Sequence, residues 1–275
     1  MTSKQSVGYH SIVAALTPSA ANQPAVIRAV NVAAKLNSEV TLANVITTKQ
    51  DSVSEQTSTD IINQLTTGHA EITGTKSAQG NWLELINLAN EVSGDLIVLD
   101  DKVYSELAPL LIKSSKESCD HGDCDALIVH SHRYSPTAPP RDYQHIVVAA
   151  DLNDQGLMTI YKAVRTAKRF QSRLSLLNVV ELFDPDKGDS EEKIKKLRLR
   201  GLDAFTAVIE GIEIEKEVLV TKESVGRAVC VFATEHNADL VVIGSHKFKG
   251  LCVLHGKKAQ QVINGSTCDV LVVHE

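Results

Sequence analysis

Aromatic residues are scarce in this 275-residue chain, at 4% of the total, although apolar residues as a whole reach 43%. The interior must therefore be built mainly from alanine, valine, leucine and isoleucine. Such a composition favours helices packed against buried strands, and it disfavours a β-sandwich with an aromatic core.

The chain also lacks long apolar runs, a regular cysteine pattern and an excess of positive charge. No stretch approaches the ~20 apolar residues of a transmembrane helix, and the N-terminal stretch lacks the features of a signal peptide. Five irregularly spaced cysteines do not form a disulfide framework. A net charge of −6 gives no bulk attraction to nucleic acid or to anionic membranes. We therefore expect a cytoplasmic protein with reduced thiols that binds neither nucleic acid nor membrane.

An internal repeat organises the chain, because three blocks of the first half align without gaps on blocks of the second half. The offset between the copies is 134 residues in the first block (143 − 9) and 144 in the last (268 − 124). The second copy therefore carries ten extra residues in its middle, within or near the charged stretch 184–201. The matched blocks are 9–46 with 143–180, 88–102 with 232–246, and 124–130 with 268–274.

A proline-rich segment separates the two copies. We predict a first domain at 1–133, a semi-rigid linker at 134–142 and a second domain at 143–275. The last strand of each copy is apolar and would leave an exposed edge if it stayed unpaired. We therefore expect the domains to pair within the chain, and we expect a homo-oligomer such as a dimer.

Each copy alternates short apolar strands with amphipathic helices. The apolar runs 11–16 and 145–150 are rich in alanine, valine and isoleucine, and helical patterns follow at 23–37 and 156–171. Alternation of this kind predicts parallel strands with right-handed crossovers. The expected fold class is α/β, with two tandem doubly wound domains that each contain a five-stranded parallel sheet flanked by helices.

Four segments of the second copy resemble the universal stress protein family: "HIVVAAD" (145–151), "SLLNVV" (175–180), "ADLVVIGSHK" (238–247) and "CDVLVV" (268–273). The chain looks like the tandem form of that family, since the repeat extends the resemblance to the first half. The resemblance implies an adenine nucleotide alpha hydrolase-like fold and a stress-response role that depends on binding a partner or small ligand. Some members bind ATP, whereas members of the type-A branch do not bind it appreciably.

In a doubly wound sheet, ligands bind at the carboxyl ends of strands where the strand order reverses. In the second copy, Asp151 follows the first strand and Gly244 ends the fourth, so both are expected at this crevice. ATP-binding members carry a glycine, two residues, a second glycine, nine residues, and then Gly-Ser or Gly-Thr. Here Lys247 replaces the second glycine, and Gly256 with Lys257 matches the last pair only after a one-residue deletion.

The sequence therefore predicts at most weak binding of ATP, with Mg²⁺, in the second domain, and no catalytic residues. Asp151 and the backbone near Asn178 and Val180 would position the nucleoside. Lys249 and Lys258 could add positive charge near the phosphates. The predicted binding residues are Ala150, Asp151, Leu152, Asn178, Val180, Gly244, Ser245, His246, Lys247, Gly256 and Lys257.

The first copy departs further from the ATP-binding pattern. Thr17 stands where the second copy has Asp151, and Asp100 and Asp101 stand where it has Gly244 and Ser245. Because carboxylates repel phosphate, we expect no ATP in the first domain, which would act as a scaffold for the second.

Three alternatives remain open at this point. A nucleotide hydrolase or phosphotransferase could use Asp151 to hold Mg²⁺, although no second metal ligand is evident. A zinc or redox site could form from Cys119, His121 and Cys124, but the repeat aligns this stretch with an ordinary loop before the last strand. The charged run 189–201 is expected to be a solvated helix face, and it could also bind a protein partner.

Overall fold

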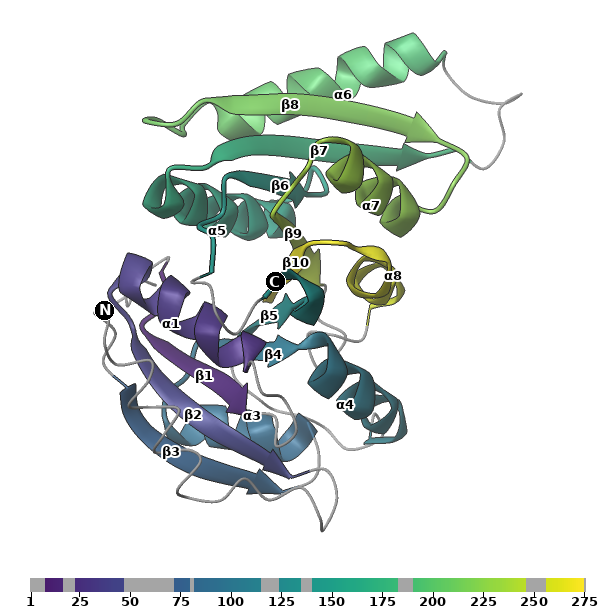
Figure 1. Ribbon diagram of the computed structural model, residues 1–275. Helices are drawn as coiled ribbons and strands as arrows, with labels where there is room; N and C mark the ends of the chain where they lie inside the picture. The colour runs from purple at the N-terminus through teal and green to yellow at the C-terminus, as the bar shows by residue number, and fades with distance from the viewer. Residues whose placement is uncertain are drawn as a thin grey trace. The chain divides into compact units, whose positions relative to one another are not determined.

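The computed structural model describes residues 8–16, 23–46, 72–79, 82–114, 124–134, 140–182, 190–245 and 256–274 (Figure 1). The described residues up to Asp142 form one compact unit, and those from Tyr143 onward form a second. Within the described residues, no helix is long and apolar enough to cross a membrane.

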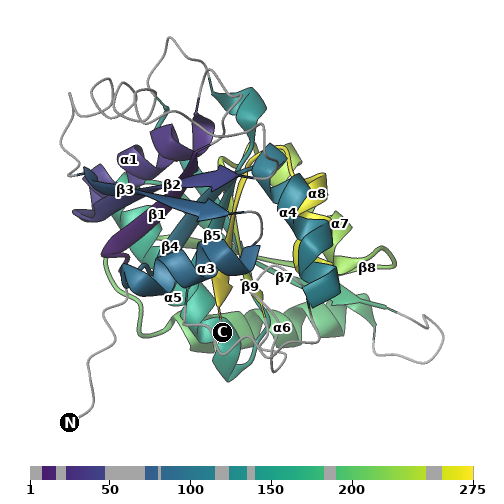
Figure 2. The ribbon, with the colours of Figure 1, turned by 90° about the horizontal axis from the view of Figure 1, so that it is seen from below.

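The first unit is a parallel sheet with helices on both faces (Figure 2). Its strands lie in the order β3-β2-β1-β4-β5. Strands β2 and β3 thus lie on one side of β1 and strands β4 and β5 on the other, so the strand order reverses between β1 and β4. Helix α1 packs on one face, and α3 and α4 pack together on the other. The elements are β1 (Ser11–Leu16), α1 (Pro24–Leu36), β2 (Glu39–Ile46), β3 (Ile72–Gln79), α3 (Trp82–Glu91), β4 (Leu96–Asp100), α4 (Asp101–Ser114), β5 (Asp125–Val129) and the 3₁₀ turn η1 (Ser131–Arg133).

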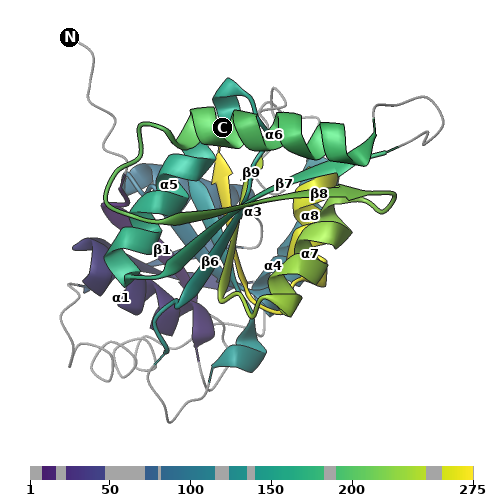
Figure 3. The same cartoon turned by 90° about the horizontal axis from the view of Figure 1, so that it is seen from above.

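The second unit repeats this architecture with strand order β8-β7-β6-β9-β10. Helices α5 and α6 cover one face of its sheet, and α7 and α8 cover the other (Figure 3). These two parallel sheets confirm the predicted α/β fold class. The elements are β6 (His145–Ala149), α5 (Asp154–Phe170), β7 (Arg173–Glu181), α6 (Glu191–Thr206), β8 (Ile214–Thr221), α7 (Val225–Glu235), β9 (Leu240–Ser245), α8 (Lys257–Gly265) and β10 (Asp269–His274).

Strand pairing reproduces the sequence repeat and shows where the ten extra residues lie. In the first two strands the offset is 134, since Ile12 pairs with Val40 as Ile146 pairs with Leu174. At the third strand it is 141 (218 − 77), because Asn44 pairs with Ser77 and Asn178 with Val218. Seven of the extra residues therefore lie between β7 and β8, the interval that contains the charged stretch. The remaining three lie between β8 and β9, where the offset reaches 144 (Leu240 against Leu96).

The described part of the charged run, from 191 to 201, lies in helix α6, as the sequence predicted. Leu202 and Thr206 are its only buried residues among sixteen, and Glu191 pairs with Lys195 at 2.8 Å across one helical turn. An exposed pair of this kind contributes little to stability. The helix thus packs along β8 but presents most of its surface to solvent.

Each unit contains the same buried hydroxyl–carboxyl pair. The Tyr9 hydroxyl donates a hydrogen bond to Asp125 Oδ2, and the Tyr143 hydroxyl donates to Asp269 Oδ2 at 2.9 Å. Both aspartates are fully buried at the start of the last strand of their unit. Buried carboxyl groups need such donors, and the repeat supplies one to each.

The described ends of the linker are anchored on α1 of the first unit. Arg28 is only 3% exposed; its Nε donates to the Tyr134 hydroxyl and its Nη1 donates to the Arg141 carbonyl oxygen at 3.0 Å. The guanidinium also lies 5.2 Å from the centre of the Tyr134 ring, a cation–π arrangement. Residues 135–139 of the predicted linker lie outside the described residues, and the domain limits themselves stay a prediction.

Asp142 completes this anchor. It accepts a hydrogen bond from Asn31 Nδ2 at 3.1 Å, and Lys35 Nζ lies 2.5 Å from its other oxygen. Partial burial alone would raise the pKa of Asp142, but the hydrogen bonds and the charges of Lys35 and Arg28 hold it below its ordinary value. The carboxylate therefore stays ionised in the folded state at neutral pH.

Candidate functional site

The carboxyl ends of β6 and β9 lie side by side in the second unit, as the predicted crevice requires. The two strands pair in parallel, with Ala149 opposite Ile243. The residues just beyond β6 therefore share one edge of the sheet with Gly244 and Ser245 at the end of β9. Asp151 is exposed at this edge, whereas Ala150 and Ser245 are buried.

Asn178 fixes the start of the Asp151 loop. Its side chain is 3% exposed, and its Nδ2 donates to the Ala150 carbonyl oxygen at 3.0 Å. Its Oδ1 is buried and has no hydrogen-bond partner among the described residues. Val180 lies two residues further along β7 and is half-buried. The structure thus brings Asn178 to the base of the predicted crevice, in a supporting position behind Asp151.

Helix α5 begins immediately after this loop, and it fixes the loop from the other side. Asn153 caps the helix, since its Oδ1 accepts the backbone N–H of Gly156 at 2.8 Å. A Cβ at position 156 would lie 2.2 Å from the Asp151 carbonyl oxygen. Because that distance is far below contact, only glycine lets the first turn of α5 approach the Asp151 loop so closely.

We expect Gly156→Ala to destabilise the protein by ~1–3 kcal/mol, because a backbone oxygen cannot move aside as a side chain can. The same change should displace Asp151 from its position beside β9. Chemical denaturation and amide chemical shifts of residues 150–153 measure the two effects. Gly201→Ala is the matched helical control: its Cβ would meet the flexible end of Leu152 at 2.7 Å, so the cost should be smaller. Equal losses from both substitutions would contradict this account.

The N-terminus of α8 lies next to Asp151. Gly256 is the N-cap residue and makes no side-chain capping bond, so the first N–H groups of the helix lack a cap from that side chain. Lys258 Nζ, in the first turn, lies 3.9 Å from Asp151 Oδ2. Both side chains are about half exposed or more, so the contact contributes little to stability. It does show that Asp151, Gly256 and Lys257 lie at the same edge, as the sequence predicted.

In the first unit, two carboxylates lie where the second unit has Gly244 and Ser245, at the start of helix α4. Helix α4 starts at Asp101, directly after β4, and buried Asp100 accepts the Val103 N–H at 2.8 Å. Asp101 Oδ1 accepts the backbone N–H of Ser131 at 3.2 Å and its hydroxyl as well. Asp100 therefore caps the helix as an anion would, in addition to repelling phosphate, whereas Asp101 binds the turn at Ser131. Thr17 lies outside the described residues.

Several residues of the predicted nucleotide and zinc sites lie outside the described residues. His246 and Lys247 of the nucleotide crevice lie outside the described residues, as does Lys249. Cys119 and His121 of the zinc hypothesis also lie outside them, whereas Cys124 is buried at the start of β5. Among the described residues, no group of three histidine, cysteine, aspartate or glutamate side chains is arranged to hold a metal ion.

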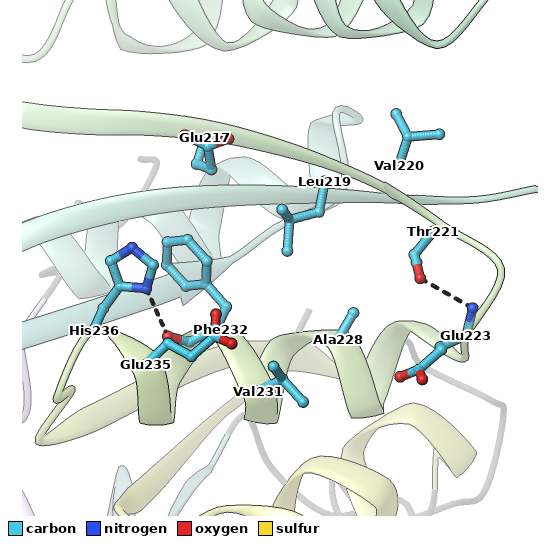
Figure 4. A pocket seen from close by; sticks show the side chains of 10 residues that line it. All are labelled: Glu217, Leu219, Val220, Thr221, Glu223, Ala228, Val231, Phe232, Glu235 and His236. Carbon is cyan, nitrogen blue, oxygen red and sulfur yellow. Dashed lines mark hydrogen bonds between the residues drawn. The ribbon is translucent and has the colours of Figure 1, made fainter.

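The structure also contains a groove that the sequence did not predict, between β8 and α7 (Figure 4). Its volume is about 510 Å³. The sequence did not indicate that β8 would be an edge strand only partly covered by α7, which contacts α8 and β7 more than β8. The lining residues are Glu217, Leu219, Val220, Thr221, Glu223, Ala228, Val231, Phe232, Glu235 and His236.

Parallel sheets covered by helices on both faces, with a crevice at the strand reversal, define a doubly wound α/β protein. The model of the universal stress protein family matches residues 142–274. The chain is 31% identical over 142 residues to the universal stress protein MJ0531 of Methanocaldococcus jannaschii, which covers 48% of this chain and 82% of that protein. It is 27% identical over 139 residues to universal stress protein A homolog 1 of Coxiella burnetii, covering 48% of this chain and 96% of the relative. The chain belongs to the universal stress protein family.

Solved structures extend the likeness to both halves at the level of the fold. A universal stress protein from Archaeoglobus fulgidus superposes with a TM-score of 0.65 at 15% identity, covering 98% of this chain and 99% of that chain. A functionally unknown protein from Pseudomonas aeruginosa superposes with a TM-score of 0.67 at 19% identity, covering 98% of this chain and 93% of that chain. The first half, which the family model does not cover, therefore shares the fold.

Proposed function

We propose that this chain is a tandem, type-A-like universal stress protein of the cytoplasm that acts by binding and catalyses no reaction. Its second domain would hold ATP weakly at the crevice beside Asp151, and its first domain would serve as a scaffold. Pairing of the domains and a homo-oligomeric assembly belong to the same proposal, as does an unidentified protein partner.

The observation that carries the nucleotide part is the contrast between the two helix N-termini. At α8 the cap residue is Gly256, which has no side chain to bond the first N–H groups, and the helix starts beside Asp151. Helix α4 starts earlier in the repeat, directly after β4, and there the carboxylate of Asp100 accepts the Val103 N–H. A helix N-terminus favours a phosphate group, provided that no anion of the protein is already there. We therefore place the phosphate at the N-terminus of α8, in the second domain.

Two features support weak binding. Lys247 stands where ATP-binding members have a glycine, and the spacing to Gly256 is one residue short. A side chain at a position that requires close backbone approach opposes phosphate binding, although the lysine charges offset part of that loss. Asp151 and the backbone near Asn178 and Val180 would hold the nucleoside, and Gly244, Gly256 and Lys257 would surround the phosphates.

Thermal unfolding with Mg-ATP tests this proposal. At a ligand concentration equal to Kd, binding stabilises the folded state by ~0.4 kcal/mol, which raises Tm by ~1–2 °C. We expect a shift of this size only at millimolar ATP, its loss in Asp151→Ala, and its retention in Glu192→Ala, an exposed carboxylate on α6. No shift at any ATP concentration would refute nucleotide binding. Release of phosphate above the level of a mock purification, abolished in Asp151→Ala, would instead show a hydrolase.

A further inference from the structure

The groove between β8 and α7 lies on the face of the second unit's sheet that carries α7 and α8. Side chains of a strand alternate between its two faces, so Glu217, Leu219 and Thr221 share the face towards α7. Figure 4 shows Leu219 pointing from β8 towards α7, and Phe232 and His236 pointing from the α7 side towards the sheet. The groove is thus walled by the edge strand on one side and by one helix on the other.

The helical wall is aromatic and well fixed. The Phe232 and His236 rings are stacked, with centroids 3.9 Å apart and an interplanar angle of 22°. His236 Nδ1 donates to the Phe232 carbonyl oxygen at 2.9 Å, and the His236 carbonyl oxygen accepts from His145 Nδ1 at 2.9 Å. His145 is itself buried and bonded through Nε2 to Ser175 at 2.8 Å. Phe232 and His236 on the helix, together with Leu219 on the strand, therefore give the groove a preformed apolar surface.

The rim of the groove is negative. Glu217, Glu223 and Glu235 line it, and none of the lysines and arginines that the structure describes does. Glu223 is paired with Arg227 at 2.9 Å, outside the lining. Glu217 and Glu235 have no ion pair within 4 Å among the described residues. The pKa of Lys195 is raised mainly by its bond to Glu191, and the more distant charge of Glu217 adds to that rise. Two exposed carboxylates therefore face the groove without a cation in contact.

We propose that this groove binds a small organic cation, with its ammonium group at Glu217 and Glu235 and its apolar body against Leu219 and Phe232. The volume of about 510 Å³ lies within the range of small-ligand pockets, ~300–1,000 Å³. Carboxylates attract an ammonium group and repel phosphates, so a nucleotide is excluded on charge. Phe232, stacked on His236, contributes apolar surface to the wall of the groove. This site is separate from the crevice at Asp151, which is formed by other elements of the same unit.

Titration of the ¹⁵N-labelled full-length chain with phenethylamine, monitored by amide chemical shifts, tests the proposal. The largest shifts are expected at Thr221, Ala228 and His236. Glu217→Gln and Glu235→Gln should each weaken binding about three- to fivefold, and both together about tenfold or more. Both side chains are exposed, so the variants should fold; Glu192→Gln on α6 is the matched control and should bind like the wild type.

The neutral analogue 2-phenylethanol separates charge recognition from simple apolar binding. It should bind at least tenfold more weakly than phenethylamine, and millimolar Mg-ATP should not displace phenethylamine. Equal affinity for the two compounds, unchanged binding in the double variant, or shifts that fall away from β8 and α7 would each overturn the proposal. Because the ATP test uses a different site and different variants, either result can fail while the other stands.

Discussion

Arg28→Ala is expected to lower the free energy of unfolding by ~3 kcal/mol, since removing one partner of a buried charged network leaves the others unsatisfied. Arg28 is 3% exposed and bonds the Tyr134 hydroxyl, Asn31 and the Arg141 carbonyl. The substitution should also release the ends of the linker from α1, so that trypsin cleaves after Arg141 faster than in the wild type. Urea denaturation and timed proteolysis measure the two effects.

Lys35→Ala is the matched control for this prediction. Lys35 lies on the same helix and contacts the same linker end through Asp142, but its side chain is 36% exposed. An exposed ion pair contributes ~0–1 kcal/mol, so the control should lose much less stability than Arg28→Ala. Similar losses from the two substitutions would show that the linker is held by charge attraction in general and not by the buried guanidinium.

Tyr9→Phe is expected to cost ~1–3 kcal/mol, because it removes a donor from the buried carboxyl group of Asp125. The second unit offers the equivalent change, Tyr143→Phe, which removes the 2.9 Å bond to Asp269. If the equivalent hydrogen bonds of the two units contribute equally to stability, the two substitutions should lower the free energy of unfolding by similar amounts. Equilibrium denaturation of the two variants makes the comparison, and a loss confined to one unit would contradict it.

The same tyrosine predicts a fall in stability at alkaline pH. Burial, followed by the nearby Asp125 carboxylate, raises the pKa of Tyr9 well above its ordinary value of 10.0. The folded state therefore keeps the phenol proton at pH values where the unfolded chain has lost it. This contribution is complete below pH 10 and decreases as pH rises above 10. Denaturation midpoints between pH 8 and 11 should fall less steeply in Tyr9→Phe than in the wild type; identical slopes would exclude this role.

The fold could be predicted from the sequence because its determinants are local and repeated. Short, continuous apolar runs such as 11–16 and 145–150 bury their side chains as strands that are covered on both faces. The observed β1 and β6 lie at these positions. The helices expected at 23–37 and 156–171 are found at Pro24–Leu36 and Asp154–Phe170. The alignment of two copies then gave each half the same strand order.

The candidate site was less accessible to prediction. Asp151 could be identified because it follows a buried strand at the point where the order reverses. The cap at Asp100 could not, since the sequence does not reveal that α4 would start directly after β4 and turn a repelling carboxylate into a helix cap. Nor does it reveal the requirement for glycine at Gly156, which depends on the path of the Asp151 loop.

By itself, the sequence determined the two-copy organisation, the strand–helix order and the edge of the sheet where Asp151 lies, because periodicity and repetition are properties of the chain. Only the tertiary structure decided that Asp100 caps α4, how Arg28 binds the linker ends, and that β8 and α7 enclose a groove. Each of these features depends on distances between segments far apart in the sequence. Such distances are set by packing, and no local pattern encodes them.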